Sequence, residues 1–196
     1  MCELKMTSVI NSESDFFKAD DFRSIMACSA KQDVRYYLIS ICLCNRYEKP
    51  MIVATNGHVL LAIDEPKVAD IVDKGEHIII SPFNIKGSCH FINIEKQGDE
   101  LIASLLDKRY GVLERIFLKA IDARYPDIGP LLDSVEVDNN LEGGVIGITP
   151  KYLGSIDKIF RSNAVVMKFN GCEGAIKITS TGLPNYRLVV MPARIY

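Results

Sequence analysis

The spacing of apolar positions near the start of the chain predicts a helix. Between Asp20 and Lys31 the apolar residues recur at helical intervals and share one face. Asp20 and Asp21 stand in the first turn and Lys31 in the last, where the helix dipole favours acidic and basic side chains respectively. We therefore predict a helix over residues 20–31 that packs its apolar face on a core.

The segment after this helix has the pattern of β-strands. Val34–Asn45 and Met51–Ala54 are apolar and rich in β-favouring residues. The sequence Thr55-Asn56-Gly57 then leads into a third run, Val59–Ile63. An Asn-Gly pair between apolar runs is a strong hairpin signal, because both residues tolerate positive φ. We expect Val59–Ile63 to fold back on Met51–Ala54.

The middle of the chain is rich in predicted strands and has no second long helical pattern. Tyr125 to Pro130 forms an extended linker, and residues 133–144, which are acidic and rich in Asn and Gly, indicate a flexible connection. The four predicted strands before this connection cover residues 77–81, 90–95, 101–106 and 115–122.

The last third begins with the clearest helix of the chain. Thr149 is a predicted N-cap and Pro150 occupies the first helical position. The helix, residues 150–161, has one apolar face and one basic face. The basic face consists of Lys151, Lys158 and Arg161. Three strands are predicted to follow, over residues 164–170, 174–179 and 186–194.

Two segments, residues 13–64 and 145–195, thus share the order of one helix followed by three strands. We predict an α+β fold of antiparallel sheets with the two helices on one side. The final strand, within Asn185–Tyr196, is apolar up to Pro192 and lies at the end of the sequence. Such a strand must pair into a sheet or line a surface that something else covers.

Composition and charge narrow the class of protein. The chain has 196 residues, is 48% hydrophobic and 24% charged, and carries 23 Lys and Arg against 25 Asp and Glu. A net charge of -2 excludes a broadly basic protein but allows a local basic face. No apolar run approaches the about 18 residues of a membrane span, and the start lacks a leader pattern. We expect a soluble, cytoplasmic protein.

The candidate chemistry favours binding over catalysis. The sequence contains no P-loop, GxSxG or HExxH motif, so we expect neither an enzyme nor a cofactor. The six cysteines show no CxxC spacing, which favours buried free thiols over metal ligands. A zinc site formed by Cys42, Cys44 and Cys89 with His90 is the alternative. The basic helix face, with Arg23 and Lys31 of the first helix, is either an ordinary solvated surface or a contact for DNA phosphates.

Five segments form a recognisable set. They are QDVRYYL at Gln32–Leu38, VATNGHVLLA at Val53–Ala62, DARYPDIGPL at Asp122–Leu131, VIGITPKYLGSI at Val145–Ile156 and VVMPARI at Val189–Ile195. Together and in this order they resemble segments of the bacterial DNA polymerase III beta sliding clamp. The resemblance implies a shortened DNA-clamp-like fold. Residues 1–130 correspond to the family's middle domain without its second helix, 131–144 to a linker, and 145–196 to the last half of its third domain.

The resemblance also implies a pocket for the clamp-binding peptides of polymerases and repair proteins. Val59 and Pro130 stand where the family carries basic residues, so this pocket is expected to be less positive. The matching positions are Thr55, Gly57, His58, Leu60, Pro126, Thr149, Tyr152, Val189, Val190, Met191, Pro192 and Arg194.

Two functions follow as hypotheses. The first is a clamp-like DNA replication accessory protein that tethers a polymerase or related partner to duplex DNA, as a homo-oligomer if a ring closes. The second is an adaptor or decoy that captures clamp-binding motifs without encircling DNA. The oligomeric state separates them, since a closed ring requires a symmetric assembly.

Overall fold

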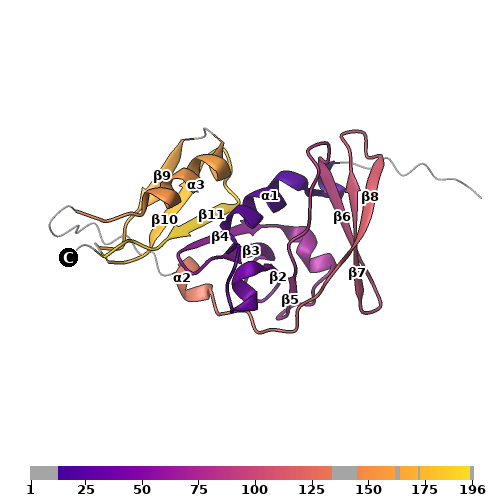
Figure 1. The fold of residues 1–196 in the computed structure, drawn as a ribbon, viewed down its shortest axis with the longest axis horizontal. Helices are drawn as coiled ribbons and strands as arrows, with labels where there is room; N and C mark the ends of the chain where they lie inside the picture. The colour runs from indigo at the N-terminus through magenta and orange to yellow at the C-terminus, as the bar shows by residue number, and fades with distance from the viewer. Residues whose placement is uncertain (1–12, 134–144, 162–163, 172, 195–196) are drawn as a thin grey trace, which may run out of the picture.

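The computed structural model describes residues 13–133, 145–161, 164–171 and 173–194. Most of the predicted connection 133–144 therefore lies outside the described residues. The described chain forms two antiparallel sheets, one of seven strands in the order β5-β2-β3-β4-β11-β10-β9 and one of four in the order β1-β6-β7-β8 (Figure 1). Helices α1 and α3 pack on the same face of the larger sheet. The predicted α+β architecture is confirmed.

The helices and strands have the following bounds. The α-helices are α1 Ala19–Cys28, α2 Gly129–Asp133 and α3 Pro150–Phe160, and the 3-10 turns are η1 Glu13–Asp15, η2 Tyr36–Ile39 and η3 Pro66–Asp70. The strands are β1 Phe17–Lys18, β2 Ile41–Cys44, β3 Met51–Thr55, β4 Val59–Asp64, β5 His77–Ile80, β6 Phe91–Gln97, β7 Glu100–Leu106, β8 Val112–Leu118, β9 Val165–Lys168, β10 Ile176–Ser180 and β11 Tyr186–Val190.

The predicted hairpin is confirmed. Strands β3 and β4 pair in antiparallel register up to Thr55 and Leu60. Gly57 has a φ of +86°, a conformation that glycine adopts without steric cost. The side-chain oxygen of Asn56 accepts hydrogen bonds from the backbone N–H groups of His58 and Val59, both at 2.9 Å. The Asn-Gly pair therefore shapes the turn through one side chain and one backbone conformation.

Several predicted boundaries were wrong. The strand predicted over 115–122 is β8, and the strand predicted over 186–194 ends at Val190. The first helix ends at Cys28 rather than Lys31, because the Ser29 hydroxyl donates to the Met26 carbonyl at 2.9 Å and closes the last turn. Only the end of the predicted strand 34–45 is extended. Its first part turns through η2, where the Leu38 N–H donates to the Arg35 carbonyl at 3.0 Å.

The two halves of the molecule meet within the larger sheet. Strands β4 and β11 are antiparallel neighbours, with Leu61 opposite Leu188 and Val59 opposite Val190. The chain's last described strand is thus tied into a central position rather than left at an edge. The predicted division at residues 131–144 remains a prediction, and this pairing joins the parts on either side of it.

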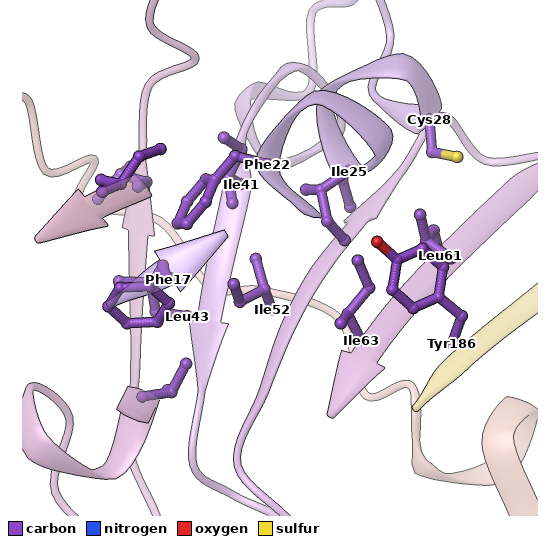
Figure 2. Packing of buried hydrophobic residues seen from close by; sticks show 14 of the residues in the cluster. Phe17, Phe22, Ile25, Cys28, Ile41, Leu43, Ile52, Leu61, Ile63 and Tyr186 are labelled. Atoms are coloured by element: carbon purple, nitrogen blue, oxygen red, sulfur yellow. The ribbon is translucent and has the colours of Figure 1, made fainter. Parts of the chain in front are cut away.

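The main core lies between the larger sheet, the helices and the smaller sheet, which contributes Ile92, Ala103 and Leu105. Phe22 and Ile25 of α1 point down onto Ile52, Leu61 and neighbouring strand residues (Figure 2). Burying such side chains contributes about 1.5–3 kcal/mol each relative to leaving them exposed. In the part of the chain that the structure describes, no helix has the length and apolar character needed to cross a membrane.

Candidate functional site

A pocket of about 270 Å³ opens on the sheet face opposite α1 and α3. Its walls come from η2, the β3–β4 hairpin, β11 and residues 126–131. We call residues 126–131 the pocket segment. Several predicted peptide-binding residues line it, namely Thr55, Gly57, His58, Leu60, Pro126, Val189 and Met191. Segments that are distant in sequence therefore meet at one concave surface.

Strand alternation explains which tail residues reach this pocket. Successive side chains of a strand point to opposite faces, so Val189 lies on the pocket face whereas Leu188 and Val190 belong to the main core. Beyond the end of β11, Met191 also lines the pocket, and its backbone N–H donates to the His58 carbonyl at 2.9 Å. Val190, a predicted pocket residue, is instead a core residue.

The other predicted residues lie at the border of the pocket or beyond it. The Tyr152 ring stacks on the His58 ring with 5.8 Å between centroids, which places α3 beside the pocket rim. Thr149 and Arg194 are exposed and Pro192 is half-buried, and none of the three lines the pocket. Thr149 precedes α3 as predicted, but its side chain makes no capping hydrogen bond.

The sequence analysis missed part of the wall. The missed lining residues are Arg35, Tyr37, Leu38, Asp127, Ile128 and Leu131, whereas Val59 lines the pocket as the resemblance implies. The first three lie within the QDVRYYL segment, which was interpreted as a strand rather than as the start of a turn. Arg35 is held by Asp33, which accepts from its backbone N–H at 2.8 Å and from its Nε at 2.9 Å. This pair places a cation at a largely apolar site.

The pocket segment is fixed by one tyrosine from the β2–β3 connection. The Tyr47 hydroxyl accepts from the backbone N–H groups of Ile128 at 3.0 Å and Gly129 at 3.2 Å, and donates to Asp127 Oδ1 at 2.8 Å. The hydrogen bond from Tyr47 lowers the pKa of Asp127. Tyr47 therefore positions one wall of the pocket without lining the pocket itself.

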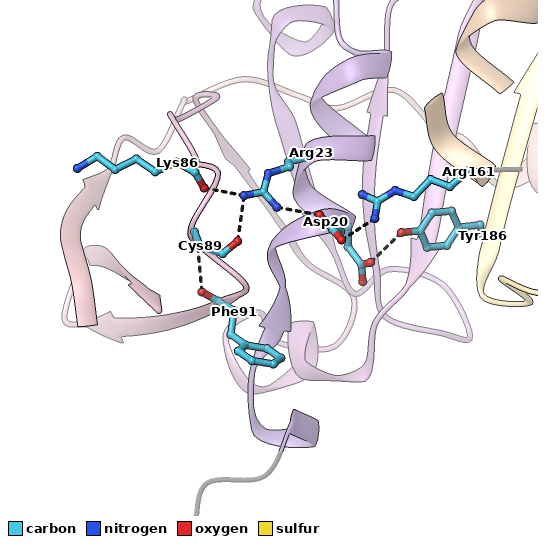
Figure 3. A network of polar contacts seen from close by, with 8 residues as sticks. Asp20, Arg23, Lys86, Cys89, Phe91, Arg161 and Tyr186 are labelled. Carbon is cyan, nitrogen blue, oxygen red and sulfur yellow. Dashed lines mark hydrogen bonds and ion pairs between the residues drawn. The ribbon is translucent and has the colours of Figure 1, made fainter. Parts of the chain in front are cut away.

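The predicted DNA-contact residues divide into paired and unpaired cations. Asp20 accepts from Arg161 at 2.6 Å and from Arg23 at 2.7 Å, which links the end of α3 to the start of α1 (Figure 3). Arg23 also donates to the carbonyls of Lys86 and Cys89. The hydrogen bond from Arg161 lowers the pKa of Asp20 to about 2, so this carboxylate remains charged at neutral pH.

Three further cations of the predicted DNA face are exposed. Lys31, Lys151 and Lys158 have no carboxylate within salt-bridge distance in the described ranges. The basic surface that the sequence predicted is therefore weaker than its residue count implies, because two of its arginines neutralise an aspartate instead.

The alternative zinc site does not assemble. Cys42 and Cys44 are buried on the pocket side of the larger sheet, whereas Cys89 is buried in the main core on its other side. Among the residues that the structure describes, no three His, Cys, Asp or Glu side chains are grouped so that they could hold a metal.

No family model and no curated protein sequence matches this chain. Several solved structures, however, are similar to it. The chain is similar to Caulobacter crescentus pol III beta, with a TM-score of 0.62 and 12% identity, over 90% of this chain and 63% of that chain. It is also similar to a Bartonella birtlesii sliding clamp bound to griselimycin, with a TM-score of 0.58 and 16% identity, over 100% of this chain and 71% of that one.

A third similar structure is DNA polymerase III subunit beta from Borrelia burgdorferi in complex with a natural product, with a TM-score of 0.60 and 13% identity, over 95% of this chain and 66% of that one. The chain thus spans somewhat under two thirds of the Caulobacter protein's length. At these identities the similarity concerns the fold. The resemblance seen in the five sequence segments is confirmed at that level: this chain adopts the fold of the bacterial DNA polymerase III beta sliding clamps.

Proposed function

We propose that this protein is a clamp-like DNA replication accessory protein that binds the clamp-binding peptides of a polymerase or repair protein. The observation that carries the proposal is the pocket formed by the hairpin, β11 and the pocket segment on a clamp-like fold. Its lining is mainly apolar, with Arg35, Tyr37, Thr55, His58 and Asp127 carrying the polar side chains. Such a site suits a short peptide that inserts leucine or phenylalanine side chains.

Peptide binding is tested with a fluorescent peptide that carries leucine and phenylalanine anchors. Met191 lines the pocket and is 39% exposed, so Met191→Glu places a charge in the pocket with little effect on the core. We expect affinity at least about tenfold weaker than for the unmodified protein, by fluorescence anisotropy. Val166→Glu is the matched control, since Val166 is 51% exposed on β9 and lies outside the pocket. Absence of binding by the unmodified protein would overturn the proposal.

The proposal includes non-specific contact with duplex DNA through the helix face. Lys31, Lys151 and Lys158 are the exposed cations available for phosphates. Each phosphate that a protein neutralises adds about 0.9 to the slope of log affinity against log salt. A face with so few unpaired cations should give weak binding at low salt and a slope of about 2 to 3.

A second candidate function is an adaptor or decoy that captures clamp-binding peptides without encircling DNA, in the same cytoplasmic setting. The pairing of Arg23 and Arg161 with Asp20 favours it, because the shared carboxylate offsets part of their charge and holds both side chains. Light scattering after size exclusion distinguishes the two. A closed symmetric oligomer supports the accessory protein, and a monomer that binds peptide supports the adaptor. Neither function involves catalysis.

A further inference from the structure

A second cavity, of about 510 Å³, lies beside the pocket on the same face of the larger sheet. It extends over β3, β4, β11, β10 and β9, and Tyr47 and α2 form its border toward the pocket. We call it the basic cavity, because its lining includes Lys49, Lys168, Lys177 and Arg187 against two carboxylates, Glu48 and Asp64.

The basic cavity and the pocket are direct neighbours. Val189 lines the pocket and Arg187, two residues earlier on β11 and on the same face, lines the cavity. Two residues of a strand span roughly 7 Å. Likewise, Leu131 lines the pocket and its neighbour Leu132 lines the cavity. A peptide of a few residues is long enough to reach from one site into the other.

The charges of the cavity are only partly balanced from within. Asp64 accepts from Arg187 and lies 3.8 Å from Lys49 Nζ, so one carboxylate serves two cations. Lys177 Nζ donates to the Leu132 carbonyl at 2.9 Å. Lys168 is exposed, and within the described ranges no carboxylate lies at salt-bridge distance from it.

The strand register gives a further reason to expect an anion in the basic cavity. Lys168 and Lys177 are directly opposite each other on β9 and β10. Like charges at directly opposed positions destabilise a strand pair. A carboxylate that binds at the exposed Lys168 would lessen this repulsion.

We propose that the basic cavity binds an acidic segment of the same peptide whose apolar anchors occupy the pocket. This inference rests on the proposed function and adds the chemistry of the partner, which is a hydrophobic motif flanked by Asp or Glu. Because the anchors hold the acidic flank beside the cavity, the second contact is intramolecular, and a modest ion pair is enough to raise affinity.

Two fluorescent peptides with identical anchors test the inference, one with three flanking glutamates and one with three glutamines. At low salt we expect the acidic peptide to bind about fivefold more tightly than the neutral one, and the gain to shrink as salt is added. Lys168→Glu should abolish the gain while leaving the affinity of the neutral peptide unchanged. Lys108→Glu, with the same charge change at an exposed turn of the smaller sheet, should retain the gain.

The outcomes separate this inference from the proposed function. If the neutral peptide binds but glutamates add no affinity, or if the gain survives Lys168→Glu, the inference alone is overturned. If neither peptide binds, the proposed function is overturned and the inference with it. If Lys168→Glu weakens duplex DNA binding and leaves both peptides unaffected, the cavity serves nucleic acid and the inference is wrong.

Discussion

Asp20 joins two helices that no motif in the sequence connects. Its carboxylate holds Arg23 on its own helix and Arg161 at the end of α3, 141 residues away. One exposed ion pair contributes little stability, but a carboxylate shared by two arginines fixes the relative position of two helices. The same contacts remove two cations from the surface on which DNA contact was predicted.

Asp20→Asn should therefore strengthen non-specific DNA binding. Releasing Arg23 and Arg161 would make two more cations available, so the salt slope should steepen by about 1 to 2. Anisotropy titrations of labelled duplex DNA at several salt concentrations measure this slope. Asp157→Asn is the matched control, because it makes the same charge change at an exposed position on α3. Equal effects of the two variants would assign the change to net charge alone.

The buried pair Asp21 and Tyr186 stabilises the fold at a second point. The Tyr186 hydroxyl donates to Asp21 Oδ1 at 2.7 Å, and burial raises the pKa of Asp21 while this hydrogen bond lowers it. Tyr186→Phe leaves a buried carboxylate without this donor and should lower the free energy of unfolding by about 1–3 kcal/mol, measured with urea. Tyr36→Phe, at a position 66% exposed, should change stability little. Similar losses in both variants would contradict the expected role of the pair.

At the residue level, the alternation of apolar positions predicts which side chains share a face, and the chemistry of single residues predicts turns. Alternation along β11 fixes which side chains face the core once the strand is known, and Gly57 is predictable because its turn requires positive φ. Alternation alone does not tell which face of the strand lines the pocket, so the sequence places Val190 in the pocket together with Val189. The pairing of Asp20 with Arg161 is equally hidden, because it depends on where two distant helices come to lie.

At the level of elements, the pocket segment depends on contacts from outside itself. The sequence predicts an extended linker from Tyr125 to Pro130, which covers most of this segment, but α2 begins at Gly129 within it. Neither α2 nor η2 is long enough to show a helical period. A hydrogen bond within its own turn shapes η2, whereas the pocket segment is held by hydrogen bonds to Tyr47, about 80 residues earlier.

Tyr47→Phe should loosen this wall of the pocket. The variant keeps the ring but removes the oxygen that accepts from Ile128 and Gly129, so we expect peptide affinity to fall about three- to tenfold. Anisotropy with the anchor peptide is the measurement. Tyr110→Phe serves as control, since Tyr110 packs in the smaller sheet against Phe16 and Phe91. Unchanged affinity in Tyr47→Phe would show that the wall is held by its apolar contacts alone.

At the level of the whole molecule, the seam between β4 and β11 makes the larger sheet continuous. Because the core runs under both halves, we expect a single cooperative unfolding transition in which calorimetric and van't Hoff enthalpies agree. Two separate transitions would show that the predicted division near residues 131–144 separates independently stable units. The order of elements in each half was predictable from the sequence, but their joining into one sheet was not, because no local pattern specifies which strands become neighbours.

The seam also sets the timing of folding during synthesis. β4 pairs with β11 from Ile63 opposite Tyr186 onward, so β4 lacks one of its two neighbours until β11 has been made. At about 5–20 residues per second, the roughly 120 residues in between take about 6 to 24 s to synthesise. During that interval the nascent chain would expose an apolar strand edge, which is a template for aggregation. The protein would then rely on chaperones until β11 leaves the ribosome.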